Sequence, residues 1–242
     1  MTDVDPGPPI FAAVRAFDVE ALRREIAAGV DPDLHSPTGA TPLHYAVGWR
    51  TMYQEEIEER IRERLACISL LLEAGASVDS VYRGRTPLHY QAHNQSPTYQ
   101  AVIAALLEAG ADPNFTGTCP HVDGPLSVLA MAARDGTAGV VRLLISAGAL
   151  DLDRALELAN DTNLRPGNCV PLLRAGASLP PHQGTYWRTR EYIERIRAAG
   201  GYKAYEKAHR QRLVAIFLPK FPSLPVEMLE RVLEFTWDIG GH

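Results

Sequence analysis

A four-residue word, Thr-Pro-Leu-His, occurs twice in the chain, at 41–44 and again at 86–89. Both copies are followed by Tyr, and both lead to an apolar run that closes with Glu-Ala-Gly-Ala, at 73–76 and 108–111. A long word repeated in the same order indicates a stacked array of one small unit, because each unit can bury its apolar face only against its neighbours. This repeat constrains the fold more than any other feature of the sequence.

The repeated word resembles that of the ankyrin repeat, a β-turn followed by two antiparallel helices with a period of about 33 residues. The resemblance implies an all-α solenoid that binds other proteins. It also implies that His44 and His89 are structural, with rings that hydrogen-bond within and between neighbouring turns. In each word, the Thr hydroxyl can cap the following helix, and Pro suits the first helical position because it has no N–H to satisfy.

The unit boundaries follow from five glycines that close apolar runs, since Gly is the usual residue where a helix ends in a left-handed conformation. They are Gly29, Gly75, Gly110, Gly148 and Gly176, at intervals of 46, 35, 38 and 28 residues. We expect four to five repeats in an array at 1–180, with a helical C-terminal cap and tail at 181–242. The expected units are about 8–38, 39–82, 83–116, 117–150 and 151–180.

Individual helices can also be predicted. In the first unit we expect helices at 9–17 and 19–28, with Asp18 as the N-cap of the second. The fourth unit carries a degenerate word at 124–127. In the cap, apolar spacings predict helices at 187–199 and 202–217 that cover the open end of the array.

The second unit contains an insertion with helical periodicity. Apolar residues recur there at spacings of 4, 4, 3 and 4: Ile57, Ile61, Leu65, Ile68 and Leu72. They predict one amphipathic helix over about 53–74, several turns longer than the usual second helix of a unit. Either this helix is a solvated extension, or Ile57 and Ile61 form a docking ridge.

A second insertion, at 115–124, is rich in Gly, Pro and Asp and is predicted to be a loop. It holds Cys119, His121 and Asp123, but alternate residues in one loop lack the separate elements that orient a catalytic triad. A zinc site would need four ligands, and no second cluster is present. Asn114, just before the loop, is expected to stabilise the turn.

Enzyme motifs are missing as well. The sequence has no glycine-rich phosphate loop, H-x-x-x-H zinc pair or nucleophile elbow. We therefore expect no catalytic activity, no cofactor and no metal ion.

Cysteine usage and apolar content indicate the cellular compartment in which the chain is expected to reside. The three cysteines are an odd number and widely spaced, which favours a reducing compartment, the cytoplasm or the nucleus. No apolar stretch approaches the length of a membrane span, and the first residues lack the pattern of a signal peptide.

Net charge is −5 overall but +6 over 181–220, where basic residues alternate with Glu191, Glu194 and Glu206 at helical spacings. This alternation favours a solvated helix face over a nucleic-acid surface.

The segment 224–237 has a Pro suited to a helix start and a wide apolar stripe. It resembles the opening helix of an F-box, whose pattern is Leu-Pro-x-Glu followed by paired apolar residues. That resemblance implies docking to a ubiquitin-ligase linker subunit, while the alternative is a helix that folds back onto the tail. The residues that would dock the linker are Leu224, Pro225, Met228, Leu229 and Val232.

The array is expected to bind a partner protein through its concave face, made from hairpin tips and first helices. Aromatic and Arg side chains dominate binding hot spots, so the candidate contacts are His35, Tyr82, Arg83, Arg85 and Phe115. The leading hypothesis is a monomeric scaffold or adaptor. The alternative is a substrate receptor of a ubiquitin ligase, in which the array holds the client and 224–237 holds the ligase.

Overall fold

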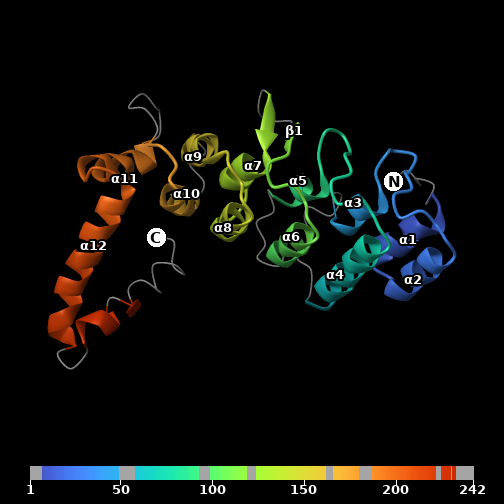
Figure 1. Ribbon diagram of the computed structural model, residues 1–242, viewed down its shortest axis with the longest axis horizontal. Helices are drawn as coiled ribbons and strands as arrows, with labels where there is room; N and C mark the ends of the chain where they lie inside the picture. Colours follow the sequence, from blue (N-terminus) through green and yellow to red (C-terminus); the bar gives the residue numbers. More distant parts are fainter. Residues whose placement is uncertain are drawn as a thin grey trace.

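The computed structural model describes residues 7–48, 58–92, 99–118, 124–161, 166–179, 187–221, 225–229 and 231–232. Within these residues, five helix pairs follow one another in a row, and two further helices end it (Figure 1). The pairs are α1 (Pro9–Ala16) and α2 (Val19–Ala27), α3 (Pro42–Ala46) and α4 (Glu58–Glu73), α5 (Pro87–Ala92) and α6 (Tyr99–Glu108), α7 (Val128–Asp135) and α8 (Ala138–Ser146), and α9 (Leu152–Asp161) and α10 (Cys169–Ala175). The expected all-α solenoid is confirmed.

The helices end where the sequence predicted. All five closing glycines adopt positive φ angles, between 81° and 104°, which few other residues tolerate. Both helices of the first unit form within a residue or two of their predicted bounds. The Asp18 carboxylate accepts a hydrogen bond from the Ala21 N–H at 2.8 Å, so the predicted N-cap of α2 is confirmed.

One continuous apolar core runs through the row, because each pair buries its inner faces against the next. Every pair contributes aliphatic side chains that are fully buried, among them Leu22, Leu43, Leu71, Leu88, Leu106, Leu129, Leu144 and Leu172. Burial of apolar surface at about 25 cal/mol per Å² is the main force that holds the row together. The array is thus stabilised mostly by contacts between neighbours.

Helix α4 has 16 residues, against 9 in α2 and 10 in α6, so the prediction of a longer second helix is confirmed. Residues 53–57, including Ile57, lie outside the described residues. The buried face of α4 differs from the predicted stripe, since it includes Arg64 and Cys67 while Leu65 and Leu72 are only half-buried.

Arg64 explains the rotated face of α4. Its guanidinium lies over the rings of Phe17 and Tyr99, at 4.8 Å and 5.2 Å from the ring centroids. Its Nη1 donates to the Ala46 carbonyl at the end of α3, at 3.3 Å. The buried guanidinium of Arg64 therefore contacts residues of the first three pairs. The face of α4 that carries Arg64 is the face that points into the core.

The second insertion, at 115–124, was predicted to be a loop, but part of it forms a strand. Strand β1 (Thr116–Thr118) pairs antiparallel with β2 (Pro125–Ser127), with Gly117 opposite Leu126. Residues 119–123, which include Cys119, His121 and Asp123, lie outside the described residues.

The position of β2 also corrects the register of the degenerate word at 124–127. Helix α7 begins after Ser127, whose Oγ accepts from the Ala130 N–H at 3.1 Å. Ser127, and not Gly124, therefore takes the place that Thr86 has in the preceding unit. The word had aligned on Pro125 and Leu126, whose backbone belongs to a strand.

The two histidines of the repeated word link neighbouring units, as the resemblance implied. Nε2 of His44 donates to the Arg85 carbonyl at 3.4 Å, and Nε2 of His89 donates to the Leu126 carbonyl at 3.0 Å. Each Nδ1 faces the Thr three residues earlier. The structural role of both histidines is confirmed.

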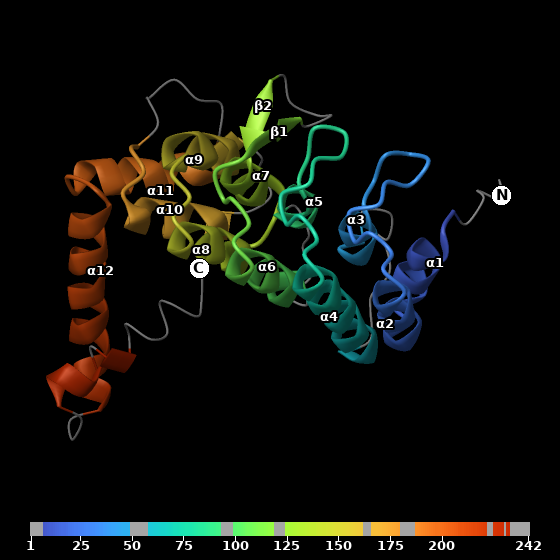
Figure 2. The ribbon, with the colours of Figure 1, turned by 45° about the vertical axis from the view of Figure 1, so that its right-hand side comes forward.

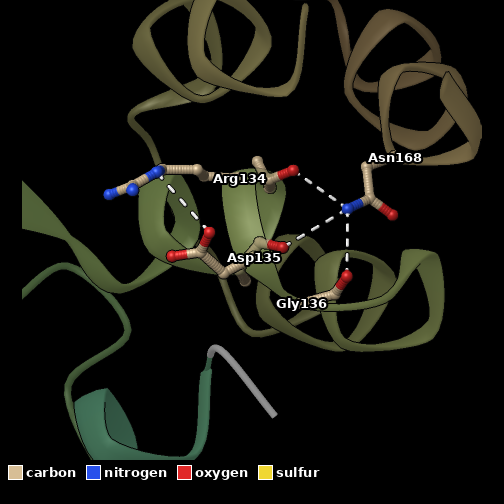
Figure 3. Close-up of polar contacts among 6 residues, drawn as sticks. Arg134, Asp135, Gly136 and Asn168 are labelled. Atoms are coloured by element: carbon tan, nitrogen blue, oxygen red, sulfur yellow. Dashed lines mark hydrogen bonds and ion pairs between the residues drawn. The ribbon is translucent and has the colours of Figure 1, made fainter. Parts of the chain in front are cut away.

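A buried asparagine closes the C-terminal end of α7. Asn168 ends the 3₁₀ turn η1 (Pro166–Asn168) and lies close to the last turn of α7 (Figure 3). Its Nδ2 faces the carbonyls of Ala132, Ala133 and Gly136, at 3.4, 2.9 and 3.2 Å. Carbonyls at the end of a helix lack partners within the helix. The Ala132 carbonyl also accepts from the Gly136 N–H at 2.8 Å, so Asn168 serves chiefly the carbonyls of Ala133 and Gly136.

Beyond the fifth pair, α11 (Trp187–Ala198) and α12 (Tyr202–Phe217) match the predicted cap helices. Ile193, Ile196 and Tyr202 are buried, whereas the second half of α12 and the turn η2 (Leu218–Lys220) are not. The apolar side chains of Leu213, Val214 and Phe217 are only half-buried, because α12 extends away from the array (Figure 1).

Several basic residues of the cap form ion pairs with its glutamates, and one glutamate of the cap pairs with α10. Arg195 pairs with Glu191, Arg197 with Glu194, and Arg174 of α10 with Glu206. These contacts favour the solvated helix face over a nucleic-acid surface. Among the described residues, no helix combines the length and apolar character that a membrane span requires.

Candidate protein-binding surface

The connections between pairs form a row of projecting turns. The segments between α2 and α3, between α4 and α5, and the β1–β2 hairpin extend to the same side of the helices (Figure 2). We call this row, with the α8–α9 connection at 147–151, the hairpin edge. It is the part of the array where backbone turns, rather than packed helices, meet the surface.

A ladder of side-chain hydrogen bonds joins consecutive turns. The Asp33 carboxylate accepts from the Ser77 N–H at 3.0 Å, and the Asp79 carboxylate accepts from the Asp112 N–H at 3.1–3.2 Å. Burial raises the pKa of Asp79, although the bond from the Asp112 N–H opposes that effect. The turns are thus tied together and offer a partner one continuous edge.

Asn114 continues this ladder into the fourth unit. Its Nδ2 donates to the Gly148 carbonyl at 3.2 Å, and its Oδ1 accepts from the Leu150 N–H at 2.9 Å. The turn-stabilising role predicted for Asn114 is confirmed.

The turn at 82–85 is the most elaborately held part of the edge. Tyr82 and Arg85 exchange backbone hydrogen bonds of 2.9 and 3.0 Å around Arg83 and Gly84, both of which have positive φ. The hydroxyl of Tyr90 donates to the Tyr82 carbonyl at 3.0 Å. The tight turn therefore holds the exposed Arg83 and the half-buried Arg85 on a fixed backbone.

Strand β1 of the next unit braces the same turn. The Thr118 N–H donates to the Gly84 carbonyl at 3.1 Å, and the Thr118 hydroxyl donates to the Arg83 carbonyl at 2.9 Å. In return, Nε of Arg85 donates to the Thr118 carbonyl at 2.6 Å. Two units thus contribute to one local structure around Arg83 and Arg85.

Both arginines lie on aromatic rings. The Arg83 guanidinium is 5.2 Å from the Tyr82 ring centroid, and that of Arg85 is 5.6 Å from the Tyr90 centroid. Burial raises the pKa of Tyr90, against the opposing effect of Arg85 and Arg83. Within the described part of the chain, neither arginine pairs with a carboxylate, so the turn presents positive charge.

The five predicted contact residues do not share one environment. His35 is exposed in the turn between α2 and α3, Arg83 is exposed and Arg85 is half-buried. Phe115 is half-buried, with its ring edge-on to His89 at 5.4 Å. Tyr82 is 3% exposed, so its ring supports Arg83 from below and offers a partner almost no area of its own.

Two exposed apolar residues on the hairpin edge were missed by the sequence analysis. Val81 is 52% exposed beside Tyr82, and Leu150 is 79% exposed beside Asn114. A signal for Leu150 was present in the sequence: the second residue after each closing glycine is polar in the other four units (Asp31, Ser77, Asp112 and Ser178). An apolar side chain at that position has no packing role in the repeat.

The F-box-like segment is described in part. Its backbone is helical at 226–229 and 231–232, with Pro225 exposed before it. Met228 is 52% exposed and Val232 49% exposed, whereas Leu229 is buried. Leu224 and residues 233–237 lie outside the described residues.

The buried cysteines and histidines of the array are uncharged. Burial raises the pKa of Cys67 to about 11 and that of Cys169 to about 12, which keeps both as thiols. Burial lowers the pKa of His44 to about 4 and lowers that of His89, so both rings are neutral. In the parts of the chain that are described, no group of three or more His, Cys, Asp or Glu is arranged to hold a metal ion.

Comparison with known families bears on the first three pairs. Residues 10–117 match the family model of ankyrin repeats in three copies. These residues are ankyrin repeats. The match ends within β1, and the helix pairs of the array continue beyond it to α10.

Two curated relatives share part of the array. Protein fem-1 homolog A of Danio rerio is 46% identical over 74 residues, and that of Rattus norvegicus is 39% identical over 79 residues. These alignments cover 30% and 32% of this chain but only 12% of each relative. The likeness is thus confined to a short stretch of much longer proteins.

Proposed function

We propose that this protein is a non-catalytic scaffold or adaptor that binds a partner protein through the hairpin edge and the adjoining concave face of its ankyrin array. The observation that carries the proposal is the braced turn at 82–85, where the exposed Arg83 and the half-buried Arg85 lie on a backbone fixed by two units. Ankyrin repeats are protein-binding modules, and a rigid edge reduces the entropy lost on binding.

The proposed contacts combine the predicted residues with those that the structure adds. Arg83, Arg85, His35 and Phe115 supply charged and aromatic side chains, and Tyr82 supports them from below. The exposed side chains of Val81 and Leu150 supply apolar area on the same edge. A mixture of Arg, aromatic and aliphatic groups is typical of binding hot spots and their surroundings.

Affinity purification with edge variants tests the proposal. The double variant Val81→Ala/Leu150→Ala should lose about tenfold or more in partner capture, since exposed apolar contacts of this size contribute about 1 kcal/mol each. Arg142→Ala, a change to an exposed residue of α8, is the matched control and should capture the same partners as the wild type. Full capture by the double variant would count against the hairpin edge.

A second function is favoured by the exposed apolar side chains of the C-terminal segment. Met228 and Val232, together with Val226, leave an apolar helix surface in solvent, as a ligase-docking helix requires. On this alternative the array holds a client, and the segment holds a ubiquitin-ligase linker. Removing residues 221–242 should then delete ligase subunits from the purified partners. An unchanged partner set would reject the alternative and leave the scaffold proposal in place.

The proposal assigns the array to 1–180 and the cap and tail to 181–242, in a monomer that needs no cofactor. The odd number of cysteines supports a reducing compartment, cytoplasmic or nuclear. The buried, neutral histidines and buried thiols support a structural rather than a catalytic use of these side chains.

A further inference from the structure

The two arginines of the 82–85 turn are held in place before any partner binds. Each guanidinium lies on a tyrosine ring, and the two rings are 6.2 Å apart, tilted by 31°. Arg side chains ordinarily lose considerable rotamer freedom on binding. Here the stacking on Tyr82 and Tyr90, and the Arg85–Thr118 hydrogen bond, have already removed part of that freedom.

Within the described residues, no carboxylate forms an ion pair with the arginines of this turn. Among the described residues, the ion pairs involve other arginines, such as Arg134 and Arg154, and none forms at Arg83 or Arg85. The two guanidinium groups lie on neighbouring rings, Arg83 on Tyr82 and Arg85 on Tyr90, so the turn gathers both charges in one place. An anion placed between them would relieve their mutual repulsion and gain charge-assisted hydrogen bonds.

The chemistry of that anion follows from the geometry and the surrounding charge. A guanidinium fork matches the planar, two-oxygen geometry of a carboxylate better than an ammonium does. Residues 1–180 carry a net charge of −8, so the array as a whole repels a polyanion such as a nucleic acid. The turn itself can neutralise one or two carboxylates, and exposed Val81 beside it can contact an apolar neighbour.

We propose that the Arg83–Arg85 pair binds an Asp or Glu side chain in a short acidic segment of the partner protein, with an apolar residue of that segment on Val81. This inference rests on the proposed function of the hairpin edge and names the chemistry of what binds there. The tyrosines and Thr118 act as positioning residues for the two guanidinium groups.

Peptide binding by fluorescence anisotropy tests the inference. Two fluorescein-labelled peptide pools of equal length carry random neighbours around one fixed position, which is Glu in the first pool and Gln in the second. The full chain should bind the Glu pool about tenfold more tightly, as expected for one charge-assisted contact. The preference should weaken with added salt.

Variants assign the preference to the two arginines. Arg83→Ala/Arg85→Ala should abolish the preference for Glu, and Arg142→Ala should retain it. Because Arg85 also holds Thr118, Arg83→Glu serves as a second variant that leaves the Arg85–Thr118 bond intact. It should lose the preference for Glu and bind a Lys pool better than the wild type does.

Three results of the binding experiments would overturn the inference. They are equal binding of the Glu and Gln pools, a preference that survives in both variants, and tighter binding of a single-stranded oligonucleotide than of the Glu pool. Partner capture that depends on Val81 and Leu150 but not on the arginines would overturn it while leaving the proposed function intact. Capture that depends on none of these residues would overturn the function as well.

Discussion

His44 and His89 show how much one residue type can contribute when it is buried between turns. Each ring bridges the Thr of its own unit and a carbonyl of the next, and that arrangement suits the neutral form, which has one donor and one acceptor. Protonation would place a second donor against groups that already donate. Burial is the main reason for the lowered pKa of both residues, with His35 and Arg85 adding like charge.

The first prediction concerns pH. Because the folded pKa of His44 lies below its ordinary value of 6.5, its contribution to stability is complete above pH 6.5. It is lost as pH falls toward about 4, since the unfolded chain binds a proton more readily. The loss is about 3 kcal/mol at most for His44. Urea unfolding at pH 7.0, 6.0 and 5.0 should show this decline, and His44→Gln should flatten it. Equal slopes in wild type and variant would contradict the account.

The second prediction concerns Asn168. Asn168→Ala leaves carbonyls at the end of α7 without their donor, which should lower the free energy of unfolding by about 1–3 kcal/mol. Gln211→Ala, at an exposed position of α12, is the control and should stay within about 0.5 kcal/mol of the wild type. Chemical denaturation followed by circular dichroism measures both. A loss no greater than that of the control would mean that water replaces the amide.

The sequence could predict the histidines but not Asn168. His44 and His89 lie in a repeated word, so their role follows from their position in it. Asn168 follows a stretch with no repeat and becomes buried only because η1 packs on the end of α7. A contact of this kind depends on tertiary structure, and local sequence carries no trace of it.

At the scale of the element, α4 shows both the strength and the limit of periodicity. Its existence and extra length follow from apolar spacing, and both are observed. Its buried face does not follow from the apolar spacing, because Arg64 lies on that face. Phe17, Tyr99 and the Ala46 carbonyl surround its guanidinium. A charged residue is ordinarily assigned to solvent, and the aromatic rings that hold this one come from other units.

The third prediction follows from this burial. Arg64→Ala removes the hydrogen bond to Ala46 and leaves a cavity between three pairs, which should lower the free energy of unfolding by about 2–4 kcal/mol. Arg62→Ala, two residues away on the exposed side of α4, should change it by less than about 0.5 kcal/mol. Thermal and urea unfolding of the two variants provide the comparison. Similar small effects would show that the buried arginine contributes nothing net.

At the scale of the whole molecule, stability is close to a sum over neighbours. The cap packs on α10 through α12, where Arg174 pairs with Glu206 at 2.7 Å. Ile193, Ile196 and Tyr202 of the cap are buried in the same apolar core as the array. The order of the helices and the presence of the cap were predictable from the repeated word, the closing glycines and the apolar spacings. The projection of α12 was not, because its apolar spacing is that of an ordinary core helix.

The fourth prediction tests this neighbour-by-neighbour stability. Ile196→Ala should loosen the cap, and hydrogen exchange should then quicken over 187–217 while 87–146 keeps its protection. Val226→Ala, at a partly exposed site, should leave both regions as they are. A uniform loss of protection along the whole array would contradict the stacked, nearest-neighbour account.

The central claim is that the hairpin edge of the array binds a partner protein. Photo-crosslinking in cells tests it most directly, with p-benzoylphenylalanine placed at exposed positions 35 and 150 on the edge, and at exposed positions 142 on α8 and 207 on α12. The account predicts that a partner is captured from positions 35 and 150 and not from 142 or 207. Capture from 142 or 207, with none from the edge, would contradict it.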